Sequence, residues 1–150
     1  ERKSALAERC GRNWQEFSRQ VEQRLASSDE LLGPVRERGF FVFHRAYDHW
    51  VQALQLKQKG ALTLSPEHKP GLKTMAKLRA QLAQGNVHCV FSEPQYDPAL
   101  VDALIGDMKI QRAELDPMAA DITLSSQGYG QFLLQLAQRA AGCLTPPSDA

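Results

Sequence analysis

Hydrophobic residues recur every three or four positions along the first part of the chain. They form a single stripe that comprises Leu6, Cys10, Trp14, Phe17, Val21 and Leu25. This spacing is the 3.6-residue period of an amphipathic helix, whose opposite side here is rich in Arg, Glu and Gln. Gly33-Pro34 supplies a stop signal. We therefore predict a helix over residues 1–32, and we expect its apolar stripe to pack on the rest of the domain.

The remainder of the chain alternates between short apolar runs and longer amphipathic segments. The short runs predict strands at 40–43, 61–64, 87–91 and 109–115, and the amphipathic segments predict helices at 46–56, 70–84, 97–107 and 127–143. Strands that alternate with helices are typical of a parallel sheet covered on both faces. The expected fold class is α/β: a three-layer lobe with a four-stranded parallel sheet, preceded by the long amphipathic helix.

Polar side chains follow three of the predicted strands at the point where each strand ends. His44 follows the strand at 40–43, Glu93 comes just after the strand at 87–91, and Asp116 ends the last strand. In a parallel sheet these positions share the carboxyl edge, which is where open α/β sheets bind ligands. An imidazole with one or two carboxylates suits a metal such as zinc. The pattern alone leaves open a metal, an organic ligand or a catalytic pair of carboxylates.

Composition excludes several function classes and leaves others open. The 150 residues are 43% hydrophobic and 23% charged, and 18 basic against 17 acidic residues leave a net charge of +1. This balance gives no electrostatic reason to expect nucleic acid or an anionic membrane as partner. No nucleotide-binding glycine motif and no nucleophile elbow of a hydrolase is present. The first residue is Glu1 rather than Met, which indicates a processed protein or an excised fragment.

Three cysteines, Cys10, Cys89 and Cys143, leave two readings open. In an oxidising compartment two of them would pair and one would remain, whereas in the cytosol all three would stay reduced. Their spacing matches no zinc finger, CxxC or haem pattern. The number and spacing of the cysteines alone do not indicate the cellular compartment.

Four segments of the chain together resemble a known family. They are Gly39–Tyr47, Cys89–Gln95, Leu115–Pro117, and the stretch from Tyr129 through Phe132-Leu133 to Cys143-Leu144. In this order and spacing they look like the zinc-binding periplasmic receptors of bacterial zinc ABC importers, the ZnuA type. The similarity runs from about residue 13 to residue 144.

The resemblance implies a domain organisation. Such receptors have two α/β lobes joined by one long helix, with the metal held between the lobes. Residues 1–32 would then be the later part of the inter-lobe linking helix, 33–144 the C-terminal metal-receptor lobe, and 145–150 a disordered tail. The N-terminal lobe, which supplies further ligands in the family, would be missing from this sequence.

The resemblance also implies roles for individual residues. His44 matches a histidine ligand, and Asp116 matches a carboxylate that binds the metal in manganese-type relatives, so Zn²⁺ is expected with Mn²⁺ less favoured. Cys89 and Cys143 match a disulfide found in the family, which places the protein in the periplasm and leaves Cys10 unpaired. Arg45 stands where many relatives carry Asp.

The function implied is capture of Zn²⁺ in the periplasm and delivery to a membrane ABC permease, by binding without catalysis. Two alternatives remain from the residues themselves. One is a metal-dependent hydrolase that uses Glu93 and Asp116, and the other is a lobe that binds a non-metal solute or a protein partner. Metal-dependent turnover would indicate the first, and a His44→Ala variant with unchanged ligand binding would indicate the second.

Overall fold

A four-stranded parallel sheet forms the centre of the structure. The computed structural model describes residues 2–63 and 70–147. Its strands are β1 (Gly39–Val42), β2 (Gln58–Ala61), β3 (Val87–Ser92) and β4 (Gln111–Glu114). They lie in the order β2-β1-β3-β4, and every neighbouring pair is parallel. The predicted four-stranded parallel sheet is therefore confirmed.

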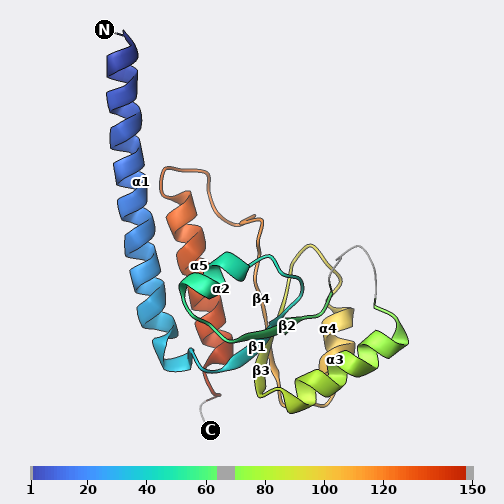
Figure 1. Ribbon diagram of the computed structural model, residues 1–150. Helices are drawn as coiled ribbons and strands as arrows, with labels where there is room; N and C mark the ends of the chain where they lie inside the picture. The colour runs from blue at the N-terminus through green and yellow to red at the C-terminus, as the bar shows by residue number, and fades with distance from the viewer. Residues whose placement is uncertain (1, 64–69, 148–150) are drawn as a thin grey trace.

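Helices cover both faces of this sheet (Figure 1). The long helix α1 (Arg2–Leu32) leads through the short 3-10 helix η1 (Gly33–Val35) into β1, and the others are α2 (Asp48–Ala53), α3 (Leu72–Gln84), α4 (Ala99–Ile105) and α5 (Gly128–Leu144). One hydrophobic core joins α1, α2 and α5 to one face of the sheet, and a second joins α3 and α4 to the other. This is the expected three-layer arrangement with its long N-terminal helix.

Strand β1 shows why its residues suit a buried position. Phe40 and Val42 point into the core beneath α5, while Phe41 and Phe43 point into the core beneath α3 and α4. All four side chains are buried, because side chains alternate between the faces of a strand and both faces here are covered. Phe40 also packs edge-on against Phe91 of β3, with the ring centroids 5.3 Å apart.

The second strand lies earlier than its apolar run predicted. The prediction placed it at 61–64, whereas the ladder with β1 runs over Gln58–Ala61. Leu62 and Thr63 still extend the pairing, because their amides donate to the carbonyls of Val42 and Phe43 at 3.0 Å. Leu64 lies outside the described residues. The prediction was wrong because an edge strand is specified by its pairing partner rather than by its own hydrophobicity.

Gly60 explains how polar β2 fits closely beside β1. A Cβ atom at this position would lie 2.6 Å from Cε1 of Phe41, whose side chain is buried. The glycine therefore lets the Phe41 ring occupy the space above the edge strand.

Two helices are shorter than predicted, since α2 ends at Ala53 and α4 spans Ala99–Ile105.

The apolar stripe of α1 is only partly covered. Val21 and Leu25 pack against the core, but Leu6 is 52%, Trp14 68% and Phe17 41% exposed. Figure 1 shows the reason, since the first half of α1 extends beyond the sheet and its other helices. The expectation that the whole stripe packs on this domain was wrong for Leu6 and Trp14, whereas the ring of Phe17 meets that of Tyr129 on α5 with centroids 5.8 Å apart. Among the described helices, none is both long and apolar enough to span a membrane.

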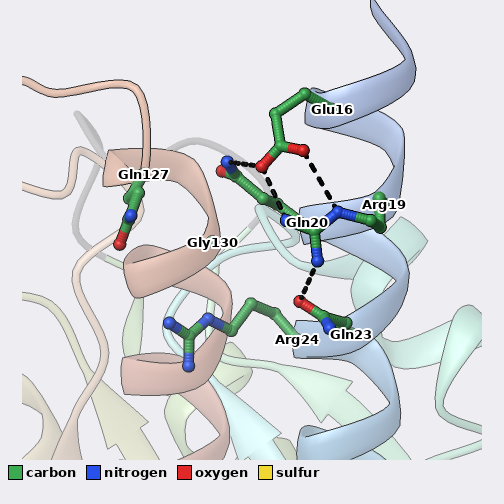
Figure 2. A pocket seen from close by; sticks show the side chains of 7 residues that line it. All are labelled: Glu16, Arg19, Gln20, Gln23, Arg24, Gln127 and Gly130. Atoms are coloured by element: carbon green, nitrogen blue, oxygen red, sulfur yellow. Dashed lines mark hydrogen bonds and ion pairs between the residues drawn. The ribbon is translucent and has the colours of Figure 1, made fainter.

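Polar side chains line the upper part of the contact between α1 and α5 (Figure 2). Glu16 and Arg19 form an ion pair at 2.7 Å on the surface of α1. Further along α1, the stem of Arg24 lies across α5 at Gly130, where a Cβ atom would come within 3.0 Å of Arg24 Cγ. The absence of a side chain at Gly130 thus lets the two long helices approach each other.

The last described residues follow α5 without forming a further helix or strand. Thr145 caps α5, because its amide and its hydroxyl both donate to the carbonyl of Ala141, at 2.8 and 2.7 Å. Residues 148–150, part of the tail predicted at 145–150, lie outside the described residues.

Candidate metal-binding site

The strand order places a topological switch point at the carboxyl edge between β1 and β3, where sheets of this kind form a crevice. From β1 the chain crosses to β2 on one side, and from β3 it crosses to β4 on the other. The loops that leave the two central strands therefore diverge, which defines the topological switch point where open α/β sheets bind ligands. His44 follows β1 and Glu93 follows β3, so the fold brings these two predicted residues together at this point.

His44 and Glu93 are in direct contact. The Nδ1 atom of His44 lies 2.7 Å from Oε1 of Glu93, and the carboxylate is almost completely buried beneath the imidazole, which is 28% exposed. A proton carried on Nδ1 would face this carboxylate, and in that tautomer the lone pair is on Nε2. A carboxylate behind a histidine in this way holds the ring orientation and raises its basicity as a metal ligand.

Burial dominates the electrostatics of Glu93. Removal from water raises the pKa of this carboxyl, and the like charge of Asp116 acts in the same direction. Contact with His44 works the other way, but it does not cancel the effect of burial. Neither carboxylate oxygen has a partner aligned as a well-formed hydrogen bond. A cation bound to His44 would place compensating positive charge near this buried group.

Asp116 reaches the same edge, but its carboxylate is already occupied. Oδ1 accepts hydrogen bonds from Gln95 Nε2 at 2.6 Å and from the amide of Met118 at 2.9 Å, and Oδ2 accepts one from the amide of Ala120 at 2.7 Å. Burial alone would raise the pKa of Asp116, but these hydrogen bonds, assisted by the charge of Arg139, lower it. Asp116 therefore stays ionised and organises the loop that follows β4.

The loop after β3 contributes two site residues that the sequence analysis did not single out. Gln95 holds Asp116, while the ring of Tyr96 stacks on Phe43 with centroids 4.7 Å apart and meets His44 edge-on at 6.4 Å. Tyr96 thus forms one wall beside the imidazole. Their position directly after Glu93, at the predicted sheet edge, was a signal that could have found both.

Two neighbours of His44 have structural roles. The buried hydroxyl of Tyr47 donates to the carbonyl of Leu115 at 3.0 Å and joins the loop after β1 to the end of β4. Arg45 is paired with Asp48 at 2.8 Å on the surface, so its charge is compensated locally. The guanidinium of Arg45, the next residue after His44, is thereby drawn toward α2.

Two of the remaining histidines lie away from this edge of the sheet. His49 is exposed on α2, and His88 is the second residue of β3, near Arg38. Burial and the positive charge of Arg38 lower the pKa of His88. His68 lies outside the described residues.

A disulfide joins the sheet to the last helix. Cys89 of β3 and Cys143 of α5 are bonded, with their Cα atoms 5.9 Å apart and both side chains buried. These are the two cysteines that the family resemblance pairs. Cys10 is free and exposed on the projecting half of α1.

The site contains fewer metal ligands than a closed zinc centre. Within residues 2–63 and 70–147, no three His, Cys, Asp or Glu side chains gather as a candidate metal cluster. Structural zinc sites use four protein ligands and catalytic ones three. The fold and the site define an α/β domain that presents one oriented imidazole at the carboxyl edge of its sheet.

Comparison with known proteins identifies the family. The family model described as "Zinc-uptake complex component A periplasmic" matches residues 1–143, and the chain belongs to this family. It is 33% identical over 132 residues to the high-affinity zinc uptake system protein ZnuA of Haemophilus influenzae, a match that covers 88% of this chain. That match covers only 39% of the relative, so the chain spans about two fifths of the length of the protein it resembles.

Solved structures agree on the fold. A crystal structure of ZnuA superposes with a TM-score of 0.67 at 22% identity and covers 83% of this chain and 45% of that one. The solute-binding protein FpvC of Pseudomonas aeruginosa, solved in complex with Mn²⁺, gives a TM-score of 0.75 at 16% identity over 95% of this chain and 53% of that one. In each case this chain matches about half of a longer chain.

Proposed function

We propose that this chain is the C-terminal lobe of a periplasmic receptor that captures Zn²⁺ and passes it to a membrane ABC permease. The observation that carries the proposal is the contact between His44 Nδ1 and Glu93 at the switch point, because it leaves Nε2 free for a metal. Family membership and the zinc-uptake function named for the relatives support the choice of cargo. Zn²⁺ would be bound and released without a chemical step.

The proposed site is one half of a metal centre. His44 would donate a nitrogen, and Asp116 would lie near the metal and give an oxygen directly or through water. Since these are too few ligands for tetrahedral zinc, the others would come from an N-terminal lobe that faces this edge. Residues 33–144 would form the present lobe, and residues 1–32 the later part of the helix that links the two.

The uncovered half of α1 supports this division. Trp14 is 68% and Phe17 41% exposed, and their rings, with the ring of Tyr129 on α5, form a partly exposed aromatic cluster beside the projecting part of the helix. Patches of this kind mark a surface that another domain or partner covers. In the proposed receptor, the N-terminal lobe would cover them.

Calorimetric titration of the chain with Zn²⁺ tests the proposal. We expect weak binding at one site that disappears in His44→Ala, because no other histidine among the described residues lies at this edge of the sheet. His49→Ala is the matched control, since this histidine is exposed on α2 outside the crevice. Equal zinc affinity in the wild type and in His44→Ala would contradict the proposal.

A further inference from the structure

The loop Glu93–Tyr96 controls both polar residues that the proposed site would offer to a metal. Glu93 contacts the imidazole of His44 from below, and two residues later Gln95 donates to the carboxylate of Asp116. A single short loop after β3 therefore orients the proposed nitrogen ligand and, at the same time, occupies one oxygen of the proposed carboxylate ligand.

The carboxylate of Asp116 has little capacity left for further hydrogen bonds or metal bonds. A carboxylate accepts about four hydrogen bonds or metal bonds, roughly two at each oxygen. Oδ1 already accepts from Gln95 and from the amide of Met118, and Oδ2 accepts from the amide of Ala120. Oδ2 keeps one open position, whereas coordination through Oδ1, and so through both oxygens at once, requires the loss of one of the two donors to Oδ1.

The two donors to Oδ1 differ in how easily they can leave. The Met118 amide belongs to the backbone two residues after Asp116, so it is tied to the turn itself. Gln95 is an exposed side chain from a different loop, and a rotation about its own bonds removes its amide. Gln95 is therefore the group that decides whether Oδ1 is available.

We propose that Gln95 is a specificity-determining residue, which withholds an oxygen of Asp116 from the metal and so favours Zn²⁺ over Mn²⁺. This inference rests on the function proposed above. Zn²⁺ accepts a nitrogen-rich site with four ligands, whereas Mn²⁺ prefers carboxylate oxygens and higher coordination. Each oxygen taken out of the site thus costs Mn²⁺ more than Zn²⁺.

Substitution of Gln95 tests the inference. Gln95→Leu keeps a similar side-chain volume but cannot donate to Asp116, and Gln95→Met is a second variant with an unbranched side chain. Gln81→Leu is the matched control, because Gln81 is an exposed glutamine on α3. Zn²⁺ affinity is measured by calorimetry, and bound Mn²⁺ is followed by its electron paramagnetic resonance signal, which reports coordination and is insensitive to small changes in stability.

We expect both Gln95 variants to raise the affinity for Mn²⁺ relative to Zn²⁺ at least about tenfold, the effect of removing one hydrogen bond to a charged group. Gln81→Leu should leave the ratio unchanged. If zinc binding depends on His44 but the ratio does not move in the Gln95 variants, the role of Gln95 is refuted and the receptor function stands. If the wild-type chain binds no zinc at all, both are refuted.

Discussion

Reduction of the Cys89–Cys143 disulfide should remove a large part of the stability of this lobe. The bond joins residues separated by 54 positions, from the centre of the sheet to the end of α5. In the chain-entropy model, a closed loop of this length restrains the unfolded chain by about 4 kcal/mol. For a protein of this size such a loss corresponds to a melting temperature lower by roughly 10 °C.

The assay compares the same polypeptide in two redox states. A Cys10→Ser background removes the one free thiol and prevents intermolecular exchange. Urea unfolding of the oxidised and the reduced protein then yields two free energies of unfolding, extrapolated to water. Because both states have the same side chains, the difference reports the cross-link without the packing changes that a substitution of Cys89 would add.

A difference below about 1 kcal/mol would refute this reasoning, because it would show that the unfolded chain is already restrained without the bond. A reduced form that is fully unfolded would still agree with the entropic account, provided that the oxidised form is no more stable than the predicted difference. A mixed bond between Cys10 and either of the other cysteines within one chain, found by peptide mapping, would contradict the assignment itself.

Three further predictions concern the site, the pH dependence and the packing of the edge strand. Glu93→Gln should weaken Zn²⁺ binding roughly 10–100-fold, as expected for the group that orients a histidine ligand. Competition with a chromophoric chelator measures the Zn²⁺ affinity. An unchanged affinity would show that Glu93 does not act on His44. Because the pKa of His88 is lowered in the folded state, the unfolded chain binds more protons, and the stability should fall as the pH drops below about 6.5. In His88→Gln the urea midpoint should fall less steeply between pH 7 and pH 5. The same pH dependence of the midpoint in both proteins would contradict this prediction. Gly60→Ala should destabilise the domain by about 1–3 kcal/mol, because the new Cβ would overlap the buried ring of Phe41. The control Gly142→Ala on α5, with open space around it, should be neutral or stabilising. Thermal melting of the two variants measures both effects.

Local pattern was enough to predict much of the architecture. The stripe of α1, the apolar runs of β1 and β3, and the alternation of strands with helices are each encoded within short segments. Parallel pairing and burial on both faces follow from that alternation, since such strands require crossover helices. For the same reason the positions of His44 and Glu93 at one sheet edge were predictable before their contact was seen.

The sequence by itself thus determined the layers, the long helix and the edge where polar residues meet. Only the tertiary structure decided that β2 begins at Gln58, that half of α1 stands uncovered, and that Gln95 occupies the oxygen of Asp116. These features depend on contacts between residues far apart in the chain, and hydrophobic periodicity carries no information about such contacts. A side chain's partner is set by the packing of all the elements around it, which exists only in the folded state.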